Sequence, residues 1–232
     1  LSGVLAAAAW AEPPATLLLD GNMLARSRER IRAGDPALQG AFSNLMHDAD
    51  AALDAGPFSV MNKTMTPPSG DKHDYMSFGR YWWPDPDQPD GLPYIRRDGE
   101  TNPDSQGPAS DRPRLGRMTD TVETLALAYH FTREAQYADR AALLIRTWFL
   151  DPATRMKPHV NYAQGIPGRR EGSKSGLIDA RLLGKVIDAV ALIDRSPALT
   201  PDECNRLREW FAAYLAWLQT GENPREEAET KN

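Results

Sequence analysis

The sequence predicts an all-α fold built from antiparallel pairs of helices. Apolar residues recur at helical spacing in successive stretches of the chain, and the alternation typical of strands is nearly absent. The links between consecutive helical stretches are short, which places neighbouring helices side by side, as in bundles, solenoids and α/α toroids. No fixed-period repeat is visible, so a short-repeat solenoid is disfavoured.

Start and stop signals bound the helices, of which we expect roughly six. Asp35-Pro36 is a cap followed by proline at the first helical position, and Thr200–Glu203 forms a capping box. Asp151-Pro152 and Gly221 mark helix ends. The stretches predicted to be helical are 35–56, 120–131, 137–148, 178–193 and 200–221.

Composition excludes several classes of function. The 232-residue chain is 41% apolar and carries a net charge of −5, which argues against nucleic acid as a partner. Its single cysteine, Cys204, rules out an intramolecular disulfide and a cysteine-based zinc site. The run Asp85-x-Asp87-x-x-Asp90-Gly91 departs from the spacing of a calcium loop. We therefore expect no cofactor and no metal, and the sequence leaves the oligomeric state open.

The first eleven residues, LSGVLAAAAWA, are similar to the apolar part and cleavage site of a secretory signal. Eleven residues are too few to span a bilayer, and no other apolar run approaches that length. We expect a remnant of a signal peptide at 1–11, a single helical domain at 12–232, no membrane partner, and a periplasmic or secreted protein.

The segment Pro67–Asp104 contrasts with its helical surroundings. It holds two adjacent tryptophans, three tyrosines and several cations within a run of Pro, Gly and Asp that cannot form a long helix. A long irregular segment rich in aromatics and hydrogen-bond donors is typical of a binding loop on a scaffold. Flat aromatic faces stack on sugar rings, and Arg, Lys and His bind carboxylates. These residue types indicate an acidic polysaccharide.

A second polar segment, Met156–Arg170, follows directly on a predicted helix end. It combines one titratable imidazole, His159, with amide, phenol and guanidinium groups. Such a set suits the binding and orientation of a uronate carboxylate.

The two segments, SGDKHDYMSFGRYWWPDP…GLPYIRRDGETNPD and KPHVNYAQGIPG, resemble the alginate-lyase-domain family of polysaccharide lyases. The resemblance covers nearly all the chain after about residue 55. It implies an α/α toroid, a periplasmic or secreted location, and cleavage of alginate-type or glucuronan-type polymers by β-elimination. The family's Asn-Asn-His motif, with a Tyr and an Arg further on, is expected to begin at or beyond Asn232. The main catalytic residues would then lie outside this sequence, and we expect the chain alone to be inactive and to expose an apolar flank.

Elimination requires donors that neutralise the carboxylate, a base for the C5 proton and an acid for the leaving oxygen. The catalytic candidates are His159 and Tyr162. The candidates for substrate binding are the remaining polar and aromatic residues of the two segments: Lys72, His73, Tyr75, Arg80, Tyr81, Trp82, Trp83, Asn161, Gln164, Arg169 and Arg170.

For several of these residues a purely structural role is an open alternative. The tryptophan pair could anchor the loop on the helical core, His73 could hold the loop by a hydrogen bond, and His159 could cap a helix end. Two other functions are also compatible with the sequence. One is an inverting glycoside hydrolase, which needs two carboxylates facing one cleft. The other is a non-catalytic scaffold that binds polyuronates.

Overall fold

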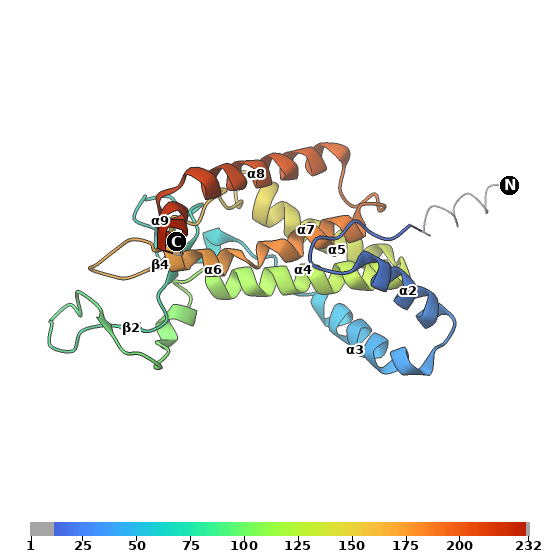
Figure 1. The fold of residues 1–232 in the computed structure, drawn as a ribbon, viewed down its shortest axis with the longest axis horizontal. Helices are drawn as coiled ribbons and strands as arrows, with labels where there is room; N and C mark the ends of the chain where they lie inside the picture. The colour runs from blue at the N-terminus through green and yellow to red at the C-terminus, as the bar shows by residue number, and fades with distance from the viewer. Residues whose placement is uncertain (1–11, 231–232) are drawn as a thin grey trace. The chain divides into compact units, whose positions relative to one another are not determined.

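The computed structural model describes residues 12–230 and is mainly helical, which confirms the predicted all-α class (Figure 1). The predicted signal remnant at 1–11 lies outside the described residues. The helices are α2 (Gly21–Arg32), α3 (Pro36–Ala52), α4 (Arg112–Thr132), α5 (Ala135–Ile145), α6 (Leu177–Ala180), α7 (Leu183–Ile193), α8 (Pro201–Thr220) and α9 (Glu222–Thr230). The short strands are β1 (Met76–Phe78), β2 (Trp82–Trp83), β3 (Ile95–Arg96) and β4 (Tyr162–Gly165).

Several helix boundaries differ from the sequence-based expectation. Helix α4 begins eight residues earlier than predicted, because its charged first turns still bury Leu115 and Met118. The helix expected at 178–193 is broken by a turn at 181–182 into α6 and α7. Helices α2 and α9 were not predicted, since neither carries a clear apolar stripe. A π-helical turn, Arg146–Leu150, follows α5.

The chain divides into two compact units. The first comprises residues 12–56, 119–145 and 183–200. Its buried Asp188, on α7, accepts hydrogen bonds from the backbone N–H groups of Leu17, Leu18 and Leu19, and so ties the N-terminal segment to the helix. The Tyr137 hydroxyl donates to Asp50 Oδ1 at 2.7 Å, which joins α5 to α3.

The second unit comprises residues 57–118, 146–182 and 201–230, and it contains both polar segments singled out above. Its core includes Trp148 and Met156, both fully buried, with Phe149 packed edge-on against Trp210 of α8. The Trp210 indole donates to the Met156 carbonyl oxygen at 2.8 Å. These contacts fix the start of the Met156–Arg170 segment against α8.

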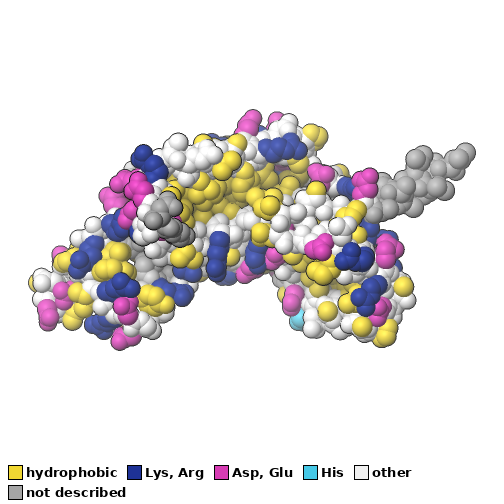
Figure 2. Space-filling view, viewed as in Figure 1, with side chains coloured by type: hydrophobic (Ala, Val, Ile, Leu, Met, Phe, Trp, Pro, Cys, Tyr) yellow, Lys and Arg dark blue, Asp and Glu magenta, His cyan; other side chains and the backbone are white. Residues whose placement is uncertain are grey.

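Helix α8 keeps part of its apolar surface uncovered. Figure 2 shows hydrophobic side chains gathered along the lower edge of α8 in this view. Among the residues of α8, Leu215 is 54% exposed. The exposed apolar flank expected from the sequence stays a prediction.

Strands β1 and β4 connect the two polar segments through a short parallel pair. Met76 pairs with Tyr162 and Phe78 pairs with Gly165, with a shift of register between the two pairs. The turn after β4 packs tightly against it: a Cβ on Gly172 would lie 1.8 Å from the Asn161 carbonyl oxygen, so only glycine fits there. Segments far apart in the sequence therefore meet backbone to backbone.

The aromatic part of the first segment forms a small antiparallel hairpin of β2 and β3. Trp82 pairs with Arg96 and Trp83 pairs with Ile95. The Asn102 side-chain amide donates to the Trp82 carbonyl oxygen at 2.9 Å, and the Trp83 indole donates to the Glu100 carbonyl oxygen at 3.0 Å. The hairpin is thus held by its own polar side chains. No helix among residues 12–230 is long and apolar enough to cross a membrane.

Candidate functional site

A cavity of about 490 Å³ in the second unit gathers cationic and aromatic side chains from both polar segments. None of the described residues that line it is acidic. We call it the arginine pocket. Its charged, aromatic and amide-bearing lining residues are Arg80, Tyr81, Trp82, Arg96, Arg112, Gln164, Arg170 and Lys174. A concentration of positive charge with flanking aromatic rings suits a carboxylated sugar.

Arg80 is the cation of the pocket that lacks a counter-charge. Within residues 12–230 its guanidinium makes no ion pair, and its buried Nε has no hydrogen-bond partner. Its Cζ lies 5.9 Å from the centroid of the Tyr81 ring, within the range of a cation–π contact. A buried donor without a partner is costly, so Arg80 is poised to bind an incoming anion.

Three other cations of the pocket are already paired. Arg96 contacts Asp98 at 2.6 Å, and both side chains are more than 60% exposed. Arg170 contacts Glu226 of α9 at 2.8 Å, and Lys174 approaches the same carboxylate at 3.9 Å. The hydrogen bond from Arg170 lowers the pKa of Glu226. These exposed pairs are weak and can exchange partners when an anion arrives.

A buried carboxylate, Asp179, holds two further polar side chains of the pocket, Arg112 and Gln164. Its side chain is 0% exposed. Asp179 Oδ1 lies 3.3 Å from Arg112 Nη1 and accepts a hydrogen bond from Gln164 Nε2 at 3.1 Å. Asp179 Oδ2 accepts from the hydroxyls of Ser77 at 2.6 Å and Tyr75 at 3.1 Å. Arg112 and Gln164 are therefore fixed from behind the pocket wall.

Gln164 has an unusual backbone conformation for a residue other than glycine. Its φ is +48°, in the left-handed region, and its backbone N–H donates to Ser77 Oγ at 2.9 Å. A side chain held in that region carries a conformational cost of order 1–3 kcal/mol, and such residues cluster at functional sites. With this backbone conformation, the Gln164 side-chain amide lies at the wall of the arginine pocket.

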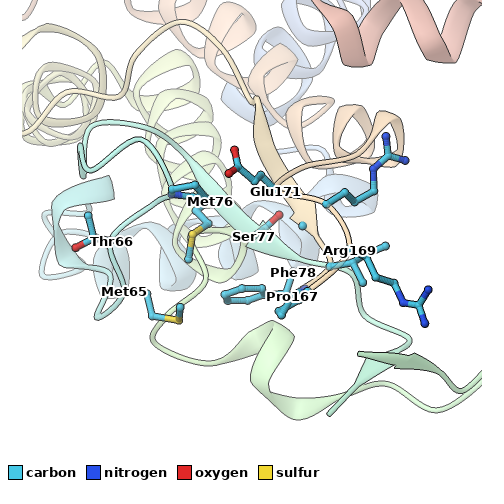
Figure 3. Close-up of a pocket in the computed structure, with 13 residues that line it drawn as sticks. Met65, Thr66, Met76, Ser77, Phe78, Pro167, Arg169 and Glu171 are labelled. Atoms are coloured by element: carbon cyan, nitrogen blue, oxygen red, sulfur yellow. The ribbon is translucent and has the colours of Figure 1, made fainter. Parts of the chain in front are cut away.

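Two further cavities adjoin the arginine pocket. Figure 3 shows an apolar one of about 450 Å³, lined by Met65, Met76, Phe78 and Pro167 among others. It shares Ile166 and Arg170 with the arginine pocket. A third cavity, of about 550 Å³, also includes Arg170 in its lining. Arg170 therefore contributes to the lining of all three cavities.

Besides Arg170, the third cavity is lined by two more of the predicted site residues, Asn161 and Tyr162. Asn161 Oδ1 accepts a hydrogen bond from the Trp217 indole at 2.7 Å, and its carbonyl oxygen accepts from Asn223 Nδ2 at 3.0 Å. Helix α8 and the start of α9 therefore fix Asn161 in place. Tyr162 lies beside it on β4.

His159 lies in a separate charged cluster. Its Nε2 is 3.2 Å from Asp74 Oδ1, and Lys157 Nζ contacts both Asp74 (3.1 Å) and Asp71 (3.0 Å). Burial lowers the pKa of His159, more than Asp74 raises it. The imidazole is therefore neutral at pH 7. No hydrogen bond links His159 to Tyr162 among the described residues.

Two cationic candidates of the first segment are tied to backbone carbonyls. Lys72 Nζ donates to the Lys63 carbonyl oxygen at 2.9 Å, and His73 Nδ1 lies 2.6 Å from the Arg155 carbonyl oxygen. His73 therefore makes the loop-tying contact that was its alternative interpretation. Neither residue lines the arginine pocket. In this structure both hold the loop.

A fully buried ion cluster lies beneath this loop. Lys63 Nζ contacts Asp111 Oδ2 at 2.9 Å, and Arg114 Nη1 contacts Asp111 Oδ1 at 3.2 Å. Met76 N–H also donates to Asp111 at 3.0 Å, and Asp111 N–H donates back to the Met76 carbonyl oxygen at 2.8 Å. Burial raises the pKa of Asp111 to about 6 despite these partners. The cluster anchors β1.

The predicted site residues thus separate into groups. Those brought to the arginine pocket are Arg80, Tyr81, Trp82, Gln164 and Arg170. Arg169 lines the apolar cavity and lies over the Trp82 ring at 5.3 Å, whereas Trp83 lies outside these cavities, under Arg97. Tyr75 requires a correction: it is 0% exposed, so its side chain cannot contact a sugar here, and burial raises its pKa well above 10.

Sequence reasoning missed the part of the site that Asp179 organises. Arg112 was not among the candidates, and Asp179 fell within the stretch predicted as one helix at 178–193. A carboxylate within an apolar helical run was the available signal. Among residues 12–230, no group of three His, Cys, Asp or Glu side chains could hold a metal ion.

Comparisons with known proteins find similarity to one family. A family model described as alginate lyase matches residues 59–232. A crystal structure of an alginate lyase from Bacteroides ovatus superposes with a TM-score of 0.89 at 45% sequence identity. The match covers 94% of this chain and 57% of that one, so the chain spans little more than half of the length of this relative. A search of curated proteins finds no match.

Proposed function

The chain belongs to the alginate lyase family, and from this premise we propose that it forms the substrate-binding part of a polysaccharide lyase. The enzyme would cleave uronic-acid polymers of the alginate or glucuronan type by β-elimination. The arginine pocket is the observation that carries the proposal. It offers an uncompensated Arg80 and a fixed Arg112–Gln164 pair, with Trp82 as a flat wall.

The proposed reaction uses this charge directly. A base removes the C5 proton of the uronate, the electron pair forms a C4–C5 double bond, and the C4–O4 bond breaks. The leaving oxygen takes a proton from an acid. Negative charge moves onto the carboxylate as the proton leaves, so donors already aimed at that group lower the barrier. Arg80 and Arg112 would supply this stabilisation without a metal ion.

We propose His159 as base and Tyr162 as acid among the residues present in this chain. The neutral imidazole of His159 supports the first role, because a protonated imidazole could not accept the C5 proton. Asp74 beside Nε2 would orient the ring, and Nδ1, which accepts a long hydrogen bond from the Asn161 backbone N–H at 3.5 Å, would exchange that contact for the C5 proton. Tyr162 lines the cavity next to the arginine pocket. We also propose that further catalytic groups lie beyond Asn232.

An inverting glycoside hydrolase fits the pocket less well. That mechanism needs two carboxylates on opposite sides of the bond that breaks, about 6.5–9.5 Å apart. The described lining of the arginine pocket contains no carboxylate, and Asp179 lies behind its wall with both oxygens occupied. Binding of polyuronates without turnover is the second candidate, because the binding groups are present here.

The deciding experiment follows the ultraviolet absorbance of the unsaturated product with alginate and with glucuronan, in the presence and absence of EDTA. This chain and a form extended beyond Asn232 are compared. We expect signal from the extended form, unchanged by EDTA, and binding by both forms. New reducing ends without ultraviolet absorbance would replace elimination by hydrolysis. Fractionation of expressing cells tests the predicted export.

A further inference from the structure

We infer that Asp179 is a positioning residue that aims Arg112 and Gln164 into the arginine pocket. The inference rests on the proposed binding of uronates at this pocket. Asp179 does not itself line the pocket. Its Oδ1 contacts two residues that do, Arg112 and Gln164, and its Oδ2 accepts hydrogen bonds from two supporting hydroxyls. Its effect on a ligand would therefore be exerted through the two pocket residues.

The hydrogen-bonding pattern supports a positioning role over general packing. Arg112 and Gln164 share Oδ1, on the side of the pocket, while the Ser77 and Tyr75 hydroxyls share Oδ2. Ser77 lies on β1 and Tyr75 comes directly before this strand, which is itself paired with β4. The carboxylate is thus held from one side by the strand and holds two donors on the other. This is how a supporting group orients side chains that contact a ligand.

The backbone of Gln164 provides independent support. Its φ of +48° is strained, and the Gln164 N–H bonds to Ser77 Oγ while its side chain bonds to Asp179. Ser77 Oγ in turn donates to Asp179 Oδ2. A closed ring of three hydrogen bonds therefore fixes both the backbone and the amide of Gln164. Without the carboxylate, the strained conformation would lose its main side-chain restraint.

Because Asp179 is negatively charged, the direction in which ligand affinity changes on its removal tests the inference. The carboxylate offsets one positive charge of the pocket. If Asp179 acted only through that charge, its removal would strengthen the binding of a polyanion. If it only stabilised the fold, its removal would lower the melting temperature and leave the affinity of the folded protein unchanged. A positioning residue predicts weaker binding despite the added positive charge.

The test is isothermal titration of a uronic-acid tetramer, of the mannuronate and the glucuronate type, into the chain and its Asp179→Asn variant. A neutral glucose tetramer is the control ligand. We expect the variant to bind about tenfold more weakly, because a charge-assisted pair to Arg112 and an aligned amide are lost. The loss should shrink when Gln164→Ala is already present, since the two residues then act on one contact.

Asp188→Asn is the matched control. Asp188 is also a buried aspartate on the following helix, α7, but it accepts backbone N–H groups of the N-terminal segment. Its loss should lower the melting temperature and leave the dissociation constant within about twofold. If Asp179→Asn does not fold, Ser77→Ala decides instead, because it removes the hydroxyl that bonds both Asp179 and Gln164. A several-fold weaker affinity is then expected.

The outcomes distinguish a failure of the positioning role from a failure of the proposed uronate site. Equal or tighter binding by folded Asp179→Asn, or equal losses from both aspartate variants, overturns the positioning role and leaves the pocket in place. Absence of binding by the unmodified chain overturns the proposed uronate site, and the positioning role falls with it.

Discussion

Replacing Arg80 by alanine should weaken oligouronate binding far more than replacing Arg96. Both arginines line the same pocket, but they differ in their surroundings. Arg80 has a buried Nε and no ion-pair partner among residues 12–230, whereas the Arg96 side chain is 62% exposed and contacts Asp98. Hydrogen bonds to charged groups contribute about 1.5–3 kcal/mol, and an exposed ion pair about 0–1 kcal/mol.

These energies correspond to different changes in the dissociation constant for the two variants. Arg80→Ala should raise the dissociation constant of a uronic-acid tetramer roughly 10- to 150-fold, and Arg96→Ala less than about fivefold. Isothermal titration at fixed ionic strength measures both, because the contribution of exposed charges depends on salt. Similar losses for the two variants would show that the pocket acts by total charge alone, and an Arg80→Ala loss under twofold would refute the role assigned to Arg80.

Three further predictions concern Lys63, His130 and Trp82. Lys63→Met should destabilise the protein by about 3–5 kcal/mol in urea unfolding, because it leaves Asp111 buried without its nearest cation; a loss under 1 kcal/mol contradicts this. Burial lowers the pKa of His130 to about 4, so the unfolded state binds more protons, and stability present above about pH 6.5 should fall by up to about 3 kcal/mol toward pH 4. His130→Gln should flatten that profile, and an unchanged slope argues against it. Trp82→Ala should cost about 1–3 kcal/mol of oligouronate binding and Trp83→Ala less, since only Trp82 lines the pocket; equal effects would remove the stacking role.

The sequence was sufficient to predict the helical class and the two segments that build the site. Residue types carry this information, because aromatic rings and cations in a proline-rich run have few structural uses together. Arg80, Trp82 and Gln164 were selected on that ground, and the structure brings them to one pocket. The sequence did not show that β1 and β4 pair, because three- and four-residue strands leave no periodic signal.

Asp179 was out of reach of sequence reasoning for a geometric reason. The sequence analysis predicted one continuous helix over 178–193. The turn at 181–182 changes the register, so that Ile178 is 50% exposed and Asp179 is buried. A single break in a helix therefore exchanged the inner and outer positions, and with them the residue that supports the site.

The parallel pairing of β1 with β4 also bears on the order in which the parts of the second unit form during folding. The paired residues Met76 and Tyr162 are more than 80 positions apart, so the chain must close a long loop before they meet. Local helices form in microseconds, whereas such distant pairings slow folding. We therefore expect the pocket walls to form after the local helices, and an isolated peptide of either segment lacks the strand with which it pairs. Ligand recognition is in this sense a property of the completed unit and of neither segment alone.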